Sequence, residues 1–219
     1  MTPDIDRAAI AACHTLLEYD ISAAPIAPLP ILKSLPRVFV VSFTEIAAQT
    51  GLDRNSMVMM LGPENQDAQT FVSELDGQLH YFVAYNQRLP FYLLQRGLAR
   101  ELGHIVLGHD GTRPEDVRAT EALYFARHLL CPRPLIRLLQ SRGVDLTMET
   151  VGNLTGCYER CMMGIRKTPG AHVPADLNRL VSALFSDYLD NYLNFHRVIS
   201  HDDASARADF GTYMDNYMD

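Results

Sequence analysis

An Asp-Gly pair, Asp76-Gly77, separates two apolar runs in the first half of the chain, AQTFVSEL and QLHYFVAYN. Such a pair between strand-like runs indicates a β-hairpin, because both turn positions require a positive φ angle. RVFVVSF, at 37–43, is rich in β-branched and aromatic residues and predicts a further strand. The first half of the chain is therefore expected to hold about three strands, at least two of them antiparallel.

Helical spacing of apolar residues dominates the rest of the sequence and one N-terminal segment. Proline and glycine punctuate these segments where helices begin and end. The helices are expected at 6–19, 44–51, 90–109, 115–131, 134–143, 150–166 and 176–197. A small sheet followed by a block of helices predicts an α+β fold.

Charge and hydropathy exclude several classes of partner. The formal net charge of −7 disfavours a nucleic acid, because phosphate binding needs clustered Lys and Arg. We find no run of about eighteen apolar residues that would span a membrane. The N-terminus has no basic region followed by an apolar stretch, so the chain is expected in the cytoplasm with its four cysteines reduced.

The segment Arg100-Glu101-Leu102-Gly103-His104 is one residue away from a zinc-peptidase motif. In His-Glu-x-x-His, two imidazoles one helical turn apart reach the same metal ion, and the glutamate takes a proton from the metal-bound water. Here Glu101 and His104 are present, but Arg100 stands in the first position. A guanidinium has no acceptor lone pair and stays charged, so it cannot ligate a cation.

The sequence around this motif resembles the ImmA/IrrE-like zinc metallopeptidases. The resemblance is carried by Tyr85-Asn86, by LARELGHIVLGH at 98–109, where the family usually has His for Arg100, and by TEALYFARHLLCP at 120–132. IAPLPILKSL, RVFVVSF, the Asp-Gly hairpin and DLTMETVGNLTGCYERCMMGIRK are similar to flanking parts of the family. Together these segments extend the resemblance over most of the chain up to residue 168.

The resemblance implies a zincin-like α+β domain, in which a small antiparallel sheet packs on the metal-site helix. It implies zinc as the cofactor, His104 as the second ligand, Glu121 as the third and Glu101 as the general base. It also implies a helix-turn-helix transcriptional regulator, or another protein or peptide, as the partner. We expect the domain at 1–143, a helical extension at 144–200 and an acidic tail at 201–219.

Several arrangements could compensate for Arg100. An Arg100–Glu121 ion pair could stand where the zinc would be, because the guanidinium supplies the missing positive charge. Alternatively, Arg100 points to solvent over an empty site. His109 could replace the missing ligand, but it lies about 140° round the helix from His104 and fits only if the helix ends near Gly108. Weaker candidate ligands are His80, Cys157 and Cys161.

Two functions follow from these alternatives. In one, the chain is a non-catalytic or weakly active protein that binds a regulator in the former substrate cleft. In the other, an unusual ligand set supports an active zinc endopeptidase that cleaves a helix-turn-helix repressor. The arginine at position 100 favours the first function.

Overall fold

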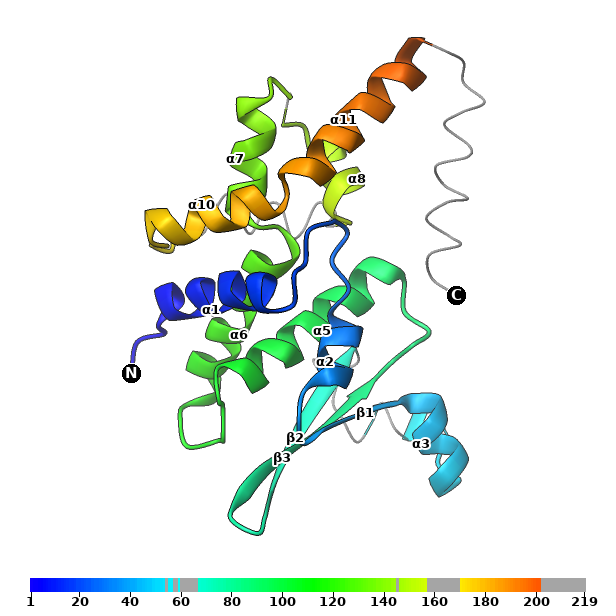
Figure 1. Ribbon diagram of the computed structural model, residues 1–219. Helices are drawn as coiled ribbons and strands as arrows, with labels where there is room; N and C mark the ends of the chain where they lie inside the picture. Colours follow the sequence, from blue (N-terminus) through cyan, green and yellow to red (C-terminus); the bar gives the residue numbers. More distant parts are fainter. Residues whose placement is uncertain (54, 57–58, 60–66, 145, 157–169, 202–219) are drawn as a thin grey trace.

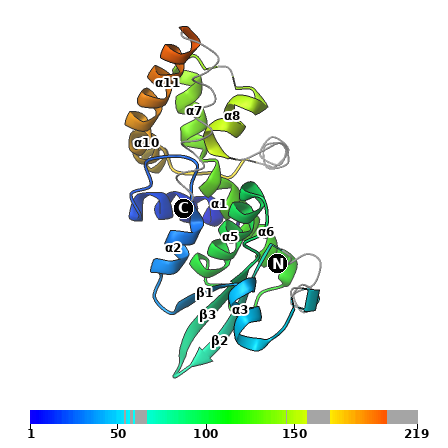
Figure 2. The same ribbon diagram turned by 90° about the vertical axis from the view of Figure 1, so that its right-hand side faces the viewer.

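A computed structural model describes the chain except for residues 54, 57–58, 60–66, 145, 157–169 and 202–219 (Figure 1). A small β-sheet lies at one end of the molecule, and the described helices, apart from the short one at 43–50, are stacked on one side of it (Figures 1 and 2). The predicted α+β fold with a small sheet and C-terminal helices is therefore confirmed. No helix in the described ranges is both long and apolar enough to cross a membrane.

The sheet has the strand order β1-β3-β2 and is formed by β1 (Val38–Ser42), β2 (Ala68–Leu75) and β3 (Gln78–Tyr85). β2 and β3 are antiparallel and form the predicted hairpin, with positive φ angles of 54° at Asp76 and 71° at Gly77. β1 pairs with β3 in parallel, so the sheet is mixed rather than wholly antiparallel. A parallel pair needs a long connection, and residues 43–77 provide it.

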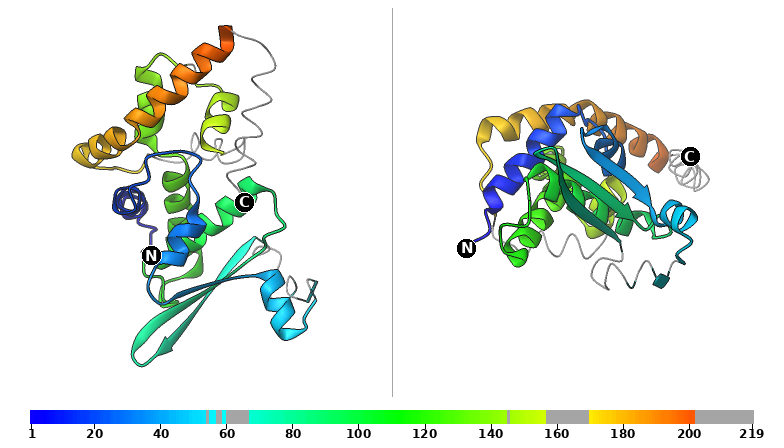
Figure 3. Two further views of the ribbon diagram at one scale, coloured as in Figure 1. Left: turned by 45° about the vertical axis from the view of Figure 1, so that its right-hand side comes forward. Right: turned by 90° about the horizontal axis from the view of Figure 1, so that it is seen from below.

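The inner face of the sheet is covered by α2 (Pro28–Ser34) and α5 (Phe91–Val106). α6 (Glu115–Leu130) packs along α5, and α1 (Ile5–Glu18) packs on α6. Figure 3 shows these helices against the sheet from two further directions. Alternate residues of β3 point into the core, so Tyr81 and Val83 are buried while Phe82 is not.

The C-terminal helices share this core. They are α7 (Arg133–Ser141), α8 (Met148–Thr155), α10 (Ala175–Leu184) and α11 (Ser186–His201). α10 packs on both α1 and α7. The single helix expected at 176–197 is wrong, because the chain is divided into α10 and α11 at Phe185, whose side chain is fully buried. The change of direction lets Phe185 and Leu189 both enter the core.

α3 (Phe43–Thr50) covers one end of the opposite, outer face of the sheet. Ser42 and Glu45 form a capping box at its start, and Gly51 ends it with a φ of 72°. Phe43 and Ile46 pack on Ala84 of β3. The helix expected at 44–51 is thus confirmed, and α3 leaves the hairpin end of the outer face uncovered.

Candidate functional site

The candidate site lies where α5 and α6 approach each other closely. Gly103 makes this approach possible, since a Cβ atom there would come within 2.9 Å of Phe125 and 3.1 Å of the Ala122 carbonyl oxygen. Leu98 and Leu102 on the same helix are buried in the core and fix its orientation. As a result, His104 of α5 and Glu121 of α6 face the same region.

The C-terminal end of α5 brings a third residue into this region. α5 ends at Val106, and Gly108 then adopts a φ of 65°. The His109 backbone N–H donates to the His104 carbonyl oxygen at 2.9 Å. The chain therefore turns back at Gly108. The helix thus ends before His109, which is the condition under which His109 was expected to reach the site.

The imidazole of His109 lies between the two surviving zinc-ligand candidates. Its Nδ1 is 2.9 Å from Nδ1 of His104, and its Nε2 is 3.0 Å from Oε2 of Glu121. The two imidazole rings meet edge to face, with an interplanar angle of 71°. One histidine ring thus links His104 to Glu121 through both of its nitrogens.

The carboxylate fixes the direction of these hydrogen bonds. An ionised carboxylate can only accept, so Nε2–H of His109 donates to Glu121. A neutral His109 then has an acceptor at Nδ1, and Nδ1–H of His104 donates to it. Both Nδ1 atoms are therefore engaged in this hydrogen bond, while Nε2 of the neutral His104 keeps its lone pair.

The carboxylate of Glu121 accepts hydrogen bonds from three donors. Its Oε1 accepts the backbone N–H of Asp4 at 2.8 Å, and its Oε2 accepts Nη1 of Arg113 at 2.7 Å as well as His109. The side chain is only 1% exposed. Burial raises the pKa of Glu121, but the hydrogen bonds from Asp4 and His109 and the charge of Arg113 outweigh it and lower the pKa below its ordinary value. Glu121 is consequently ionised at neutral pH.

The two histidines of this network are neutral. Burial, followed by the charges of His109, Arg100 and Arg118, lowers the pKa of His104 to about 3. Burial also lowers the pKa of His109, although its hydrogen bond to Glu121 acts in the opposite direction. The compensating positive charge at Glu121 therefore comes from Arg113 and not from a histidine.

Arg100 points away from this network, toward β2. Its Nε and Nη2 both lie 3.0 Å from Oε1 of Glu101, and Nη2 also donates to the Ala68 carbonyl oxygen at 3.1 Å. Asp67 lies 3.7 Å from the same nitrogen. The expected Arg100–Glu121 ion pair is therefore wrong. The physical reason is that the long Arg100 side chain, although it starts on the same helical face as His104, is drawn to Glu101 and the Ala68 carbonyl oxygen, and the partner of Glu121 is supplied by Arg113 instead.

Glu101, the candidate general base, is 3% exposed and has Arg100 as its cationic partner. Burial raises the pKa of Glu101 above its ordinary value, and the charge of Arg100 offsets only part of this effect. Arg96 neutralises the neighbouring Asp67 at 3.2 Å. The candidate base is thus held in an ion-pair network at the edge of the sheet.

The donor set does not fit a zinc ion. Position 100 offers no lone pair, the ring of His109 and the guanidinium of Arg113 both occupy Oε2 of Glu121, and Arg113 brings a positive charge within 2.7 Å of that oxygen. Across the described residues, no group of three His, Cys, Asp or Glu side chains is arranged to hold a metal. Beside Glu121, the imidazole of His109 fills the space next to the carboxylate, and the guanidinium of Arg113 balances its negative charge.

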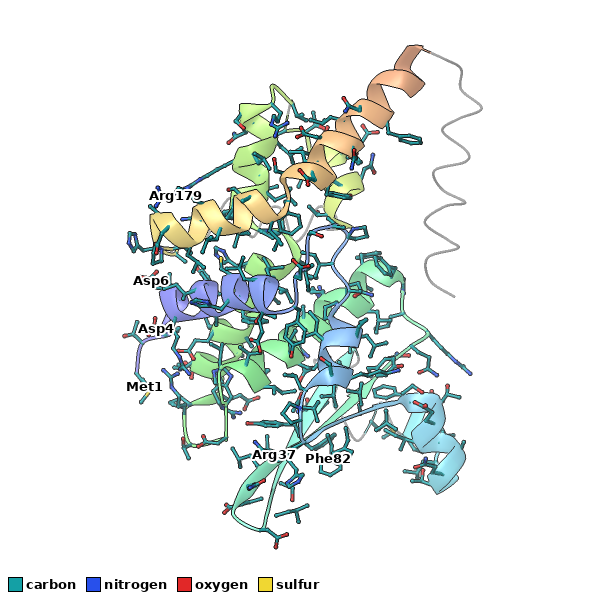
Figure 4. The ribbon with its side chains drawn as sticks, viewed as in Figure 1. Met1, Asp4, Asp6, Arg37, Phe82 and Arg179 are labelled. Atoms are coloured by element: carbon teal, nitrogen blue, oxygen red, sulfur yellow. The ribbon has the colours of Figure 1, made fainter. Side chains whose placement is uncertain are left out.

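The weaker candidate ligands do not all lie in the described part of the chain. His80 lies on the outer face of the sheet, stacked on Phe39 at 6.3 Å, and does not approach His104. Cys157 and Cys161 lie outside the described residues. Sequence reasoning missed Arg113 and the Asp4 backbone, because neither belongs to a ligand pattern. Figure 4 shows Met1 and Asp4 beside the loop that joins α5 to α6.

Comparison with known families agrees with this geometry. The family model described as Peptidase_M78, IrrE N-terminal-like domain, matches residues 53–152, which include β2, β3, α5 and α6. No curated protein matches the chain, and no solved structure does. The matched range contains every residue of the two networks except Asp4. Residues 53–152 thus match the IrrE N-terminal-like domain, which supports the resemblance of this part of the chain to the ImmA/IrrE-like family.

Proposed function

We propose that this ImmA/IrrE-type metallopeptidase-fold protein has little or no peptidase activity and acts by binding a regulatory protein or peptide. The observation that carries the proposal is Arg100, which replaces a metal ligand and is committed to Glu101 and the Ala68 carbonyl oxygen. A residue that has no lone pair and pairs with the candidate base is incompatible with the family's hydrolytic arrangement.

The second network supports the same proposal. A metal site that merely lacked one ligand would leave His104 and Glu121 with unused acceptors in a buried region, which is unfavourable. Instead, Glu121 receives three donors and His104 is paired with His109. Glu121 therefore has hydrogen-bond donors and a compensating charge without an ion.

The binding surface that we propose runs beside β2. In the described part of the chain β2 is an edge of the sheet, so its outer backbone groups can pair with an extended peptide. Arg100 reaches the start of this strand at Ala68. The family resemblance gives the class of partner: a helix-turn-helix transcriptional regulator, or another protein or peptide.

The decisive measurement is the zinc content of the purified protein by elemental analysis. We expect zinc far below one ion per chain. Arg100→His should raise the zinc content, and Arg100→His combined with His109→Ala should raise it further, because His104 and Glu121 then lose the ring that lies between them. Arg96→His, one turn earlier on α5 and paired only with Asp67, is the matched control and should bind no additional zinc. Near-stoichiometric zinc in the unaltered protein would contradict the proposal.

An active zinc endopeptidase that cleaves a helix-turn-helix repressor is the second candidate. It is favoured by one observation: His104, His109 and Glu121, two imidazoles and a carboxylate, are within hydrogen-bonding distance in series. In that case His109→Ala would remove zinc from the unaltered site. Incubation with a repressor encoded beside the gene separates the two candidates, since we expect binding without cleavage.

A further inference from the structure

The free edge of β2 alternates between backbone groups that are used by the sheet and groups that are not. In an antiparallel pair, alternate residues direct both their N–H and their C=O toward the neighbouring strand, and the residues between them direct theirs away from it. Asn86 donates its backbone N–H to the Asp67 carbonyl oxygen, and the register continues this pairing along the hairpin. The residues of β2 whose backbone groups point to the edge are therefore 68, 70, 72 and 74.

Side chains occupy the edge groups at the start of β2. Arg100 donates to the Ala68 carbonyl oxygen at 3.1 Å, and Nε2 of Gln69 donates to the Thr70 carbonyl oxygen at 3.1 Å. The backbone N–H of Thr70 lies against the Glu101 carboxylate, where it offsets part of the rise in the pKa of that group. These three side chains thus stand where the backbone of an added strand would otherwise bond.

The path of α5 explains why its side chains reach this part of the strand. The helix passes close to β2 at Gly97, where an added Cβ atom would lie 2.9 Å from the Cβ atom of Asp67. Arg100 and Glu101 lie on the next turn of the helix. Toward its tip the hairpin extends beyond the helices (Figures 1 and 3). The blocked part of the edge is therefore the part beside α5.

The rest of the edge is formed by Val72 and Glu74, which we call the open segment. Among the described side chains, none bonds to the backbone edge groups of these two residues. Val72 is 39% exposed, and Glu74 is exposed as well. Each of the two residues offers one N–H and one C=O, so an added strand can form at most four hydrogen bonds here.

We propose that Arg100, Glu101 and Gln69 close the first half of the β2 edge, so that a bound peptide pairs only with the open segment. The inference rests on the proposed function, because it requires that a peptide adds to this strand. Arg100 then has a second effect besides the loss of a metal ligand: it keeps the peptide away from Ala68 and so fixes the register of the partner.

The side chains around the open segment give the chemistry of the peptide. Val72 pairs with the buried Tyr81, so Val72 and Glu74 point to the α5 side of the sheet. Phe71 and Leu75 point to the other side and are about half exposed. Cross-strand neighbours prefer like apolar or opposite charged partners. The partner that fits is an extended apolar segment with one lysine or arginine opposite Glu74.

Amide hydrogen exchange, followed by NMR on the full chain, tests the open segment before any peptide is added. The amides of Phe71 and Ser73 bond to β3 and should exchange slowly, as should that of Thr70, which lies against Glu101. The amides of Val72 and Glu74 should exchange at least about tenfold faster than these neighbours. Equal protection along the strand would overturn the proposal, because the open segment would then be covered.

The binding test uses the capped peptide Thr-Val-Lys-Thr-Val-Phe-Thr, which in antiparallel pairing places its lysine opposite Glu74 and its phenylalanine opposite Phe71. Titration should shift the NMR signals of Val72 and Glu74, with a dissociation constant on the order of 1 mM. N-methylation of the lysine removes a donor that faces β2 and should weaken binding at least about fivefold. N-methylation of the central threonine, whose N–H faces away, is the matched control and should leave binding unchanged.

Variants of the chain test the open and the closed part of the edge separately. Val72→Pro removes an N–H that the sheet itself does not use and should abolish the titration shifts, and Glu74→Pro should do the same if Val72→Pro fails to fold. Gln69→Val frees the Thr70 carbonyl oxygen, which faces the last residue of the peptide, and should tighten binding about threefold to fivefold. Ser73→Ala, on the same face as Gln69, is the control and should leave the affinity unchanged.

The outcomes separate this inference from the proposed function. Shifts that appear on β1 or at Ala68 in place of the open segment would overturn the register, while peptide binding itself would stand. A peptide that does not bind even at about 5 mM would overturn the inference outright. The zinc content of the unaltered protein decides the proposed function in either case, because none of these measurements depends on a metal.

Discussion

The two buried carboxylates of the candidate site, Glu101 on α5 and Glu121 on α6, have different surroundings. At Glu101 one guanidinium, Arg100, reaches a carboxylate whose pKa stays above its ordinary value because burial dominates. At Glu121 three donors converge, and the pKa falls below its ordinary value. Both carboxylates are almost fully buried.

The difference shows that directed hydrogen bonds and a nearby cation can outweigh the effect of burial on the pKa of a carboxyl group. They do so at Glu121, whereas at Glu101 burial dominates over the charge of Arg100 and the contacts of Thr70. In this family the metal would supply much of the positive charge. In this structure Arg113 supplies the positive charge at Glu121.

The largest effect is expected at Glu121. Glu121→Ala leaves Arg113, His109 and the Asp4 amide without their acceptor, and the free energy of unfolding should fall by about 3–5 kcal/mol. Glu121→Gln keeps an acceptor and the shape, so it should lose only about 1–2 kcal/mol. Urea unfolding at pH 7 measures both. Equal losses for the two variants would mean that charge dominates and hydrogen bonding does not.

The next effect concerns Arg100. Arg100→Met removes the cationic partner of Glu101 and should destabilise the protein by about 2–3 kcal/mol at pH 7. The loss should be smaller at pH 5, because Glu101 has a raised pKa and takes up a proton when its partner is gone. Arg96→Met is the control: its guanidinium is more exposed and pairs only with Asp67, so it should cost less than about 1 kcal/mol. A loss that does not change with pH would contradict the raised pKa.

The smallest expected effect concerns His104 and the way in which the stability of the protein depends on pH. The pKa of His104 is lowered to about 3, so His104 stays neutral at pH 5 in the folded protein, while in the unfolded chain, near 6.5, it takes up a proton. Protons thus favour the unfolded chain, and stability present at pH 7 is lost as the pH falls below about 6.5. Glu101, with its raised pKa, acts in the opposite direction.

His104→Asn should therefore reduce the loss of unfolding free energy between pH 7 and pH 5 by about 1–2 kcal/mol. Thermal unfolding at a series of pH values measures this change. His14→Asn on α1, an exposed histidine, is the control and should leave the pH dependence as it is. If both variants behave alike, the neutral state of His104 is not what links stability to pH.

The elements of the fold were largely predictable from local signals. Asp76-Gly77 identified the hairpin, and Gly51 identified the end of α3. The parallel pairing of β1 with β3 was not predictable, because strand partners depend on the path of the chain and not on local pattern. The division at Phe185 was missed for a similar reason, since only the position of the core shows that Phe185 must turn inward.

The candidate site residues could be named from the sequence, but their interaction partners could not. The motif spacing pointed to Glu101 and His104, the family resemblance added Glu121, and the condition at Gly108 made His109 a candidate. The sequence could not show that Arg100 turns toward Ala68. It also gave no sign of Arg113, because an arginine in a loop has no fixed direction before the loop is folded.

Asp4 takes part in two structures at the same time. Its side chain caps α1 by accepting the Arg7 amide, while its own amide donates to Glu121. Anything that draws Glu121 away, whether an ion or a bound peptide, also releases the first turn of α1, which packs against α6 and α10. The exchange rate of the Arg7 amide hydrogen therefore gives a remote signal of whether the site is engaged.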